Sequence, residues 1–327
     1  MEPTIPSGNK EELVGVAQSV WRDSAALRGM LPEPSRKAVA DVVRSMNGYY
    51  SNLIEGHKTR PADIEAALAH SFSKSPKERE RQMLHAAHLD TLSLAEEGLS
   101  DDTPITSPEY MCWLHKEFFK RLPDGMRVVQ TSDGKEYRFE PGAIREANVS
   151  VGAHLAPDSR SLGKMLQYFD HKYAPHISDS PESLIAACAS HHRLVWIHPF
   201  DDGNGRIARM ATHLWFKKAG AGGSGLWTLS RGLARNLEEY RTRLSQADEK
   251  RMNDYSGAKQ TGKIFRIPPV GLNPVARLLG DQRGGDHRAG DPKLFQSPGD
   301  HEPARPSLVA DVKPAFLVAS DPSQELF

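Results

Sequence analysis

The chain contains little cysteine and carries no net charge. Its 327 residues include only two cysteines, Cys112 and Cys188, which lie far apart in apolar helical patterns. They are predicted to be buried free thiols, which argues against a disulfide framework or a cysteine metal site. Lysine plus arginine and aspartate plus glutamate both number 42. The overall charge therefore favours neither a nucleic acid nor a membrane surface as a partner.

The sequence also lacks a long apolar run. No stretch approaches the ~20 residues that a transmembrane helix needs. Residues 1–6 are largely polar and carry no apolar core of a signal peptide. A cytoplasmic location without a membrane partner is therefore expected, although delivery into another cell by a secretion machine would leave little trace in such a sequence.

What the chain does contain is helical periodicity, which predicts a mainly α fold. Apolar spacing predicts helices over 11–31, from Ser35 to about Gly56, from Pro61, and over 77–97, about 107–120 and 182–197. The second of these is expected to bury one apolar side, formed by Val39, Val42, Val43, Met46, Tyr49, Tyr50 and Leu53. Ser230 is expected to cap a further helix that carries Leu233, Leu237, Tyr240 and Leu244.

Two segments depart from this pattern. Turn signals and short β-prone runs at 128–129 and 149–151 predict strands. Residues 257–327 include 9 prolines and 8 glycines but no Trp or Tyr. Such a stretch buries too little apolar surface to offset chain entropy, so we predict a mostly disordered tail with brief order at Val275–Leu279 and Ala315–Val318.

The most informative string is residues 198–209, His-Pro-Phe-Asp-Asp-Gly-Asn-Gly-Arg-Ile-Ala-Arg. Gly203 and Gly205 flank Asn204 just before a helical pattern that Gly220 can end. A glycine-flanked turn at a helix N-terminus exposes backbone N–H groups and the positive end of the helix dipole, which together bind anions. Arg206 and Arg209 lie three apart and offer forked donors to phosphate oxygens. The string therefore predicts a polyphosphate site beside a histidine base.

This string resembles the signature of the Fic family (Fic/Doc fold), and it matches every fixed position of that signature. The resemblance covers roughly residues 35–255. It implies a helical bundle with a small β-hairpin flap over the active site. It also implies a protein adenylyltransferase that moves AMP from ATP to a Ser, Thr or Tyr hydroxyl of a target protein. The expected division is an N-terminal helical segment 1–34, a helical region 35–105 with an inhibitory helix, a catalytic core 106–256, and the tail 257–327.

The resemblance assigns roles that the chemistry of each side chain supports. His198 would be the general base, since its unperturbed pKa lies near neutrality. Asp202 would hold Mg²⁺, which bridges phosphates. The other residues of the string would bind the nucleotide's phosphates: Gly203, Asn204, Gly205 and Arg206 around the phosphate chain, and Arg209 at the γ-phosphate.

Ser51-Asn52-Leu53-Ile54-Glu55-Gly56 resembles the family's inhibitory motif. The resemblance implies that Glu55 pairs with Arg209 through a bidentate bridge, with Ser51 as the motif's first residue. Such a bridge would remove the partner of the γ-phosphate and leave ATP badly oriented, so a self-inhibited enzyme is predicted. In some relatives the equivalent glutamate also helps remove AMP from the modified target, and the sequence leaves this open.

Residues 141–157 are similar to the family's flap, whose strand edge would pair with an extended target. Val149, Ser150 and Val151 are the predicted docking residues.

Dimerisation through the N-terminal helices is one alternative for the oligomeric state. Two other functions are weighed: transfer of another phosphate-linked group on the same fold, and a non-enzymatic binding module. The intact motif argues against the binding module.

Overall fold

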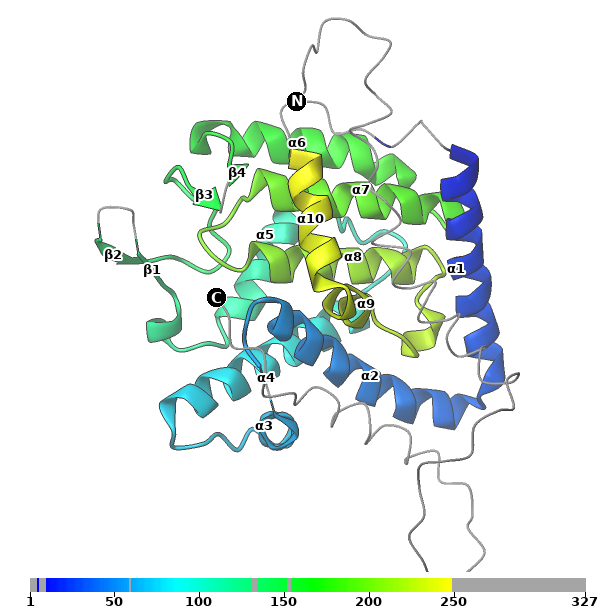
Figure 1. The fold of residues 1–327 in the computed structure, drawn as a ribbon, viewed down its shortest axis with the longest axis horizontal. Coiled ribbons are helices and arrows are strands. Elements are labelled where there is room, and N and C mark those ends of the chain that lie inside the picture. Colours follow the sequence, from blue (N-terminus) through cyan, green and yellow to red (C-terminus); the bar gives the residue numbers. More distant parts are fainter. Residues whose placement is uncertain (1–4, 6–9, 59, 131–133, 152–153, 249–327) are drawn as a thin grey trace, which may run out of the picture. The chain divides into compact units, whose positions relative to one another are not determined.

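Most of the residues that the structure describes are helical. The computed structural model describes residues 5, 10–58, 60–130, 134–151 and 154–248 (Figure 1). The described helices are α1 (Lys10–Met30), α2 (Glu33–Ile54), α3 (Pro61–Leu68), α4 (Pro76–Glu97), α5 (Pro108–Phe119), α6 (Leu162–Tyr173), α7 (Pro181–Ile197), α8 (Asn204–Lys218), α9 (Leu229–Arg235) and α10 (Leu237–Asp248). The mainly α prediction is thereby confirmed.

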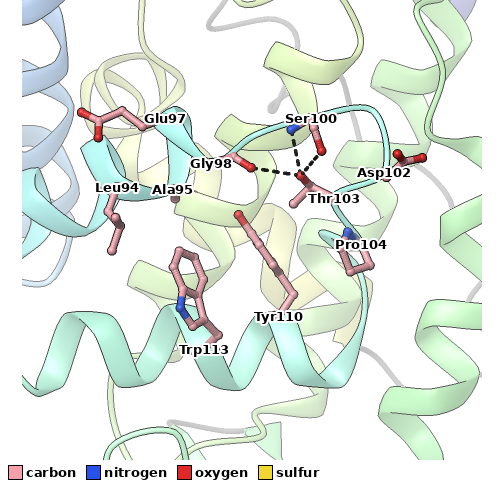
Figure 2. Close-up of a pocket in the computed structure, with 10 residues that line it drawn as sticks. All are labelled: Leu94, Ala95, Glu97, Gly98, Ser100, Asp102, Thr103, Pro104, Tyr110 and Trp113. Carbon is pink, nitrogen blue, oxygen red and sulfur yellow. Dashed lines mark hydrogen bonds between the residues drawn. The ribbon is translucent and has the colours of Figure 1, made fainter.

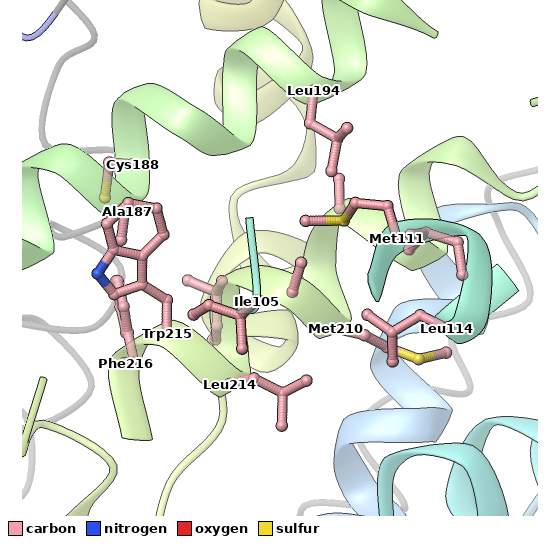
Figure 3. Packing of buried hydrophobic residues seen from close by; sticks show 14 of the residues in the cluster. Ile105, Met111, Leu114, Ala187, Cys188, Leu194, Met210, Leu214, Trp215 and Phe216 are labelled. Atoms are coloured by element: carbon pink, nitrogen blue, oxygen red, sulfur yellow. The ribbon is translucent and has the colours of Figure 1, made fainter. Parts of the chain in front are cut away.

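Helix α8 is central because it packs against α7, α5, α2 and α4 (Figure 1). Apolar side chains from α5, α7 and α8 meet in one buried cluster (Figure 3). Trp215 of α8 is 2% exposed, and its indole N–H donates to the Ser183 hydroxyl of α7 at 2.8 Å. The Trp215–Ser183 bond joins the C-terminal half of α8 to the N-terminal end of α7, and residues 198–203 connect the other ends of the two helices.

Two predicted helix starts were wrong. Helix α2 begins at Glu33 after Pro32, two residues before Ser35. Pro34 fits inside its first turn because N–H groups there lack an intrahelical acceptor in any case. The predicted helix from Ser230 is two helices, α9 after Thr228 and α10, separated at Asn236.

Helix α2 buries little of the predicted apolar side, of which only Tyr49 is buried. Val39 and Val42 are 37% and 45% exposed. The buried positions of α2 are instead mostly small or polar: Ser45, Asn47, Gly48, Tyr49, Ser51, Asn52 and Ile54. Gly48 shows why, since an added Cβ there would lie 3.2–3.3 Å from the rings of His85 and His88 on α4. The apolar prediction failed because α2 faces polar side chains of α4 and α8.

Two small antiparallel hairpins lie outside the helices. Strand β1 (Val128–Gln130) pairs with β2 (Glu136–Arg138), and β3 (Ser150–Val151) pairs with β4 (His154–Leu155). Both hairpins coincide with the predicted β-prone runs. Residues 131–133 and 152–153, between the paired strands, are not among the described residues.

The remaining predictions concern the two cysteines, membrane-spanning helices, the tail and the domain boundaries. Cys188 is buried and Cys112 is partly buried, and both are free thiols. Within the described ranges, no helix combines the length and apolar character needed to span a membrane. The predicted tail 257–327, including the two segments of brief order, lies outside the described residues. The proposed domain boundaries at 34/35, 105/106 and 256/257 stay predictions.

Candidate active site

The loop between α7 and α8 depends on two left-handed residues. His198 follows α7 with φ 50°, and Gly203 precedes α8 with φ 76°. A Cβ on Gly203 would lie 2.6 Å from the Phe119 ring, so only glycine fits there. The loop thus turns sharply and leaves the first N–H groups of α8 without intrahelical acceptors. This arrangement has the backbone geometry that the predicted anion site requires, and anion binding there stays a prediction.

The His198 imidazole is oriented by the end of its own helix. Its Nδ1 lies 3.3 Å from the Val195 carbonyl, which can only accept, so Nδ1 carries the proton. The Nε2 atom then has the free lone pair that a base requires. Burial lowers the pKa of His198 to about 4, and the positive charge of Arg145 acts in the same direction. The ring is therefore neutral at pH 7.

Phe200 anchors the loop, as the sequence suggests. Its side chain is 0% exposed. The Asn204 side chain closes the turn, since Oδ1 accepts from the Phe200 N–H at 2.9 Å and Nδ2 donates to the Phe200 carbonyl at 2.8 Å. Asn204 therefore supports the anion site through the shape of the loop and its backbone, because its side-chain amide is already committed.

His115 is a structural member of the site that the sequence analysis missed. Its ring is 0% exposed and stacks on Phe200 with centroids 4.1 Å apart. Nδ1 accepts from the Gly142 N–H at 2.8 Å, and Nε2 donates to the Asp202 carbonyl at 3.2 Å. Burial lowers its pKa to about 4, which keeps this neutral tautomer. The signal was a histidine between the apolar residues Met111, Leu114, Phe118 and Phe119 of α5, on the face that the helix buries.

Both motif arginines face α2. Arg206 is 4% exposed, and its Nε donates to Asn52 Oδ1 at 3.3 Å. Arg209 is 2% exposed, and its Nη2 lies 2.5 Å from Glu55 Oε1. Arg209 also bonds Ser51, through Nε to the hydroxyl at 2.9 Å and through Nη2 to the carbonyl at 3.1 Å. The structure thus brings together the residues predicted for inhibition and adds Asn52.

The contact between Glu55 and Arg209 differs from the expected bidentate bridge. A single Glu55 oxygen bonds Arg209, and it bonds Nη2, the nitrogen that also donates to the Ser51 carbonyl, while Nε donates to the Ser51 hydroxyl. Burial alone would raise the pKa of Glu55, but Arg209 and Arg206 outweigh it and hold that pKa below its ordinary value. A Cβ on Gly205 would lie 2.5 Å from Glu55 Oε1, so this glycine permits the approach.

Asp202 is the exposed member of the loop. Its Oδ1 accepts from the Gly203 N–H at 2.6 Å, which leaves the other oxygen free toward solvent. A cavity of about 750 Å³ runs past Asp202 and Arg206 and is also lined by His57, Arg79 and Met126. The site therefore offers one carboxylate and the buried Arg206 beside this cavity.

The predicted flap residues lie in or next to the β3–β4 hairpin. Val151 and Leu155 are 45% and 76% exposed. His154 Nε2 donates to the Trp196 carbonyl at 2.9 Å, which ties the hairpin to the end of α7 (Figure 1). Because this sheet has two strands, each strand has one edge unpaired within it.

Other candidate residues lie away from the reacting loop. His191 is buried on α7 and links the Thr212 hydroxyl with the Tyr240 hydroxyl, both at 2.8 Å. A second cavity, of about 440 Å³, is lined by Leu94, Tyr110 and Trp113 and contains no motif residue. Figure 2 shows both aromatic rings projecting from α5 toward the end of α4. This cavity is thus separate from residues 198–209.

Comparison with known proteins points to one family. Residues 104–216 match the family model described as "Fic/DOC family". The chain is similar to "Protein adenylyltransferase Fic" of Drosophila mojavensis, with 37% identity over 107 residues, 33% of this chain and 21% of that protein. The protein of the same name from Nematostella vectensis is 37% identical over 102 residues, 30% of this chain and 23% of that protein. The chain thus matches about a fifth of these relatives' length.

Solved structures extend the likeness of the fold. A Fic family protein from Desulfovibrio desulfuricans has a TM-score of 0.59 and 18% identity, covering 89% of this chain and 79% of that chain. Fic-1 from C. elegans has a TM-score of 0.57 and 17% identity, covering 85% of this chain and 78% of that chain. At such identities the comparison shows the fold, and it agrees with the predicted Fic-fold bundle.

Proposed function

We propose that this chain, which contains a Fic/DOC family domain at residues 104–216, transfers AMP from ATP to a hydroxyl group of a target protein. One observation carries the proposal: the free Nε2 of His198 stands beside a helix N-terminus that is followed by two buried arginines. A neutral base, an anion site and forked cations are what attack on a phosphate chain requires. The names of the curated relatives support AMP as the transferred group.

In the proposed reaction, His198 Nε2 accepts the proton of a Ser, Thr or Tyr hydroxyl. The hydroxyl oxygen forms a bond to the α-phosphorus, and the bond from that phosphorus to the α–β bridging oxygen breaks. Pyrophosphate leaves with the electron pair, and AMP stays on the target. The N–H groups at the start of α8 and the Arg206 guanidinium stabilise the negative charge of the phosphates.

The residues present fit a magnesium ion. Mg²⁺ is commonly held by one or two carboxylates together with substrate phosphates, and Asp202 presents one exposed carboxylate. Within the described residues no cluster of three acidic, His or Cys side chains forms a protein-only cage. Asp202 would hold the ion, and bound Mg²⁺ would neutralise charge on the α- and β-phosphates.

The same geometry supports self-inhibition. Glu55 and Ser51 occupy the Arg209 donors that a γ-phosphate would need. If ATP binds without a contact to Arg209, its α-phosphorus would be displaced from the position needed for attack by the hydroxyl. A displacement of about 1 Å costs on the order of 100-fold in rate. The proposed resting state is therefore inactive, and release of the C-terminal end of α2 would activate it.

A label-transfer assay tests this function. The wild type, Glu55→Gly, and Glu55→Gly with His198→Ala are each incubated with Mg²⁺ and ATP labelled at the α-phosphate. Self-modification or labelling of lysate proteins is expected only with the single variant. Label from the γ-phosphate alone would favour transfer of phosphate instead. No transfer from either label by a folded Glu55→Gly variant would favour a binding module.

The remaining parts of the proposal have separate tests. The exposed edges of the β3–β4 hairpin would pair with an extended segment of the target, a mode that reads little side-chain sequence. Removal of AMP by the same site is tested by incubating a labelled target with wild-type protein and Mg²⁺. Sedimentation at working concentration decides whether the chain forms the predicted homodimer.

A further inference from the structure

Arg145 is a fully buried cation that joins two parts of the site. It lies in the segment between β2 and β3, and 2% of its surface is exposed. All three of its guanidinium nitrogens donate to backbone carbonyls: Nε to His198 at 2.7 Å, Nη1 to Ala147 at 2.6 Å and Nη2 to Pro157 at 2.7 Å. Its backbone N–H donates to the Pro199 carbonyl at 2.9 Å.

The partners of Arg145 are unusual for a buried cation. No carboxylate among the described residues lies within ion-pair distance of it, and burial lowers its pKa. Asp201 and Asp158 act on it only through longer-range attraction. A buried charge without a paired carboxylate is costly, so its hydrogen bonds to carbonyl groups must fix its geometry. The planar fork of arginine can reach three separate carbonyls at once, and lysine has no such fork.

The three carbonyls belong to the base and to both ends of the flap. His198 has the left-handed backbone conformation, so its carbonyl points away from the direction that α7 would take. Arg145 donates a hydrogen bond to the His198 carbonyl in this left-handed orientation. Ala147 precedes strand β3 and Pro157 follows strand β4, so the hairpin starts and ends at Arg145. The Ala156 N–H also donates to the Val149 carbonyl at 3.2 Å.

We propose that Arg145 is a positioning residue of the transfer reaction, which fixes the backbone of the base and the two ends of the target-docking hairpin as one unit. A hydroxyl on a segment paired with the hairpin would then stand at a constant distance from His198 Nε2. The inference rests on the proposed function, since it assigns to Arg145 the alignment of the target with the base.

Arg145 also contributes charge next to the base. The groups that act on the His198 ring are Arg145 and His154, which disfavour its protonation, and Asp202 and the Val195 carbonyl, which favour it. Removing the charge of Arg145 should therefore raise the pH at which His198 titrates. Replacing Arg145 with lysine keeps a charge but loses the fork. The two variants thus separate electrostatics from geometry.

The experiment uses the full chain with Arg145→Gln, Arg145→Lys and, as a matched control, Arg160→Gln. Arg160 is an arginine near the same hairpin, 89% exposed and paired only with Asp158. Cooperative thermal unfolding first establishes that each variant is folded. Proton NMR then follows the His198 ring, identified by the signal that His198→Gln removes, and amide hydrogen exchange follows residues 147–157.

The expected results differ between the variants. Arg145→Gln raises the midpoint of the His198 titration by roughly half a pH unit or more. It also accelerates amide exchange in 147–157 by about tenfold or more. Arg145→Lys accelerates exchange and leaves the titration near the wild-type value. Arg160→Gln changes neither quantity. If Arg145→Gln does not fold, Arg145→Lys carries the exchange comparison alone.

Two outcomes would overturn either the positioning role of Arg145 or the proposed function. Exchange and titration in the folded Arg145 variants that equal those of Arg160→Gln would overturn the positioning role, whatever the activity of the chain. Altered exchange and titration in a chain that transfers no label from ATP, even with Glu55→Gly, would support the coupling of base and hairpin and overturn the proposed function.

Discussion

The two faces of α8 are buried to a similar degree but are built from different chemistry. Ile207, Met210 and Leu214 lie at helical spacing and are each 0% exposed within the main apolar cluster. Arg206, Arg209 and His213 also lie at helical spacing and are 2–7% exposed. These three polar side chains contact Asn52, Glu55 and Glu96 respectively. Burial alone therefore does not reveal which face of a helix carries function.

The difference between the faces lies in what can replace the partner. An apolar side chain on α8 gains from exclusion of water, and no solute from the cell competes for that contact. A buried arginine needs hydrogen-bond acceptors, and at Arg209 a carboxylate now in place is of a kind that a phosphate could replace. The apolar face is thus expected to hold the helix in every state, whereas under the proposed function a phosphate would displace α2 from the arginines.

The largest expected effect comes from breaking the apolar face. Leu214→Ala removes a side chain that is 0% exposed and should lower the free energy of unfolding by about 2–5 kcal/mol. Val42→Ala on α2, where the side chain is 45% exposed, should change it by less than about 0.5 kcal/mol. Urea denaturation measures both. Equal losses in the two variants would show that the apolar face of α8 is not the main support.

Breaking the polar face should change activity more than stability. Glu55→Gly frees Arg209 for a phosphate and should raise AMP transfer on the order of 100-fold. Glu97→Gly is the matched control, since Glu97 is the exposed last residue of α4 and contacts no motif arginine. Transfer of α-label per minute is the measurement. An increase with the control as large as that with Glu55→Gly would contradict inhibition by this carboxylate.

A smaller effect is expected from Ser51→Ala. This change removes the hydroxyl that accepts from Arg209 Nε and leaves Glu55 in place. The loss of one hydrogen bond, about 1 kcal/mol, should raise transfer about fivefold. Ser45→Ala removes a hydroxyl of the same helix that contacts His85 instead, and it should leave the rate unchanged. A rate with Ser51→Ala no higher than with Ser45→Ala would remove Ser51 from the inhibitory contact.

The smallest effect concerns pH. The arginines hold the pKa of Glu55 below its ordinary value of 4.5, so the ionised carboxylate stabilises the folded chain above that value. This contribution is lost as pH falls through the lower, folded-state pKa. The difference in unfolding free energy between the wild type and Glu55→Gln should therefore be constant above about pH 6 and shrink below about pH 4.5. A difference that grows on acidification would contradict the assigned direction.

Prediction from the sequence succeeded where the pattern was local. The string 198–209 predicts the glycine turn and the start of α8, which the structure contains, because a helix start and its neighbours are adjacent in the chain. The roles of His198 and the two arginines stay predictions. Glu55 was predicted from a short motif that begins at Ser51, four residues before it in the sequence. The structure brings both residues to Arg209. The prediction of a bidentate bridge between Glu55 and Arg209 was wrong, since that geometry depends on how Ser51 shares the same guanidinium.

Prediction failed where the partner is distant. The apolar side assigned to α2 was wrong because α4 and α8 present His85, His88, Arg206 and Arg209 to that helix. The roles of His115 and Arg145 were missed because each binds carbonyl or amide groups from other segments. Backbone partners leave no pattern in the sequence, since every residue has them.

The sequence by itself determined the mainly helical fold, the identity of the motif side chains and the glycine that the turn before α8 requires. These follow from helical periodicity, side-chain chemistry and the steric cost of a left-handed backbone, all of which act over a few residues. Only the tertiary structure decided which face of α2 is buried, how Arg209 is shared, and that Arg145 joins the base to the hairpin. Those outcomes depend on close contacts between segments that are up to 181 residues apart in the sequence, and packing and desolvation choose among them only when the chain is folded.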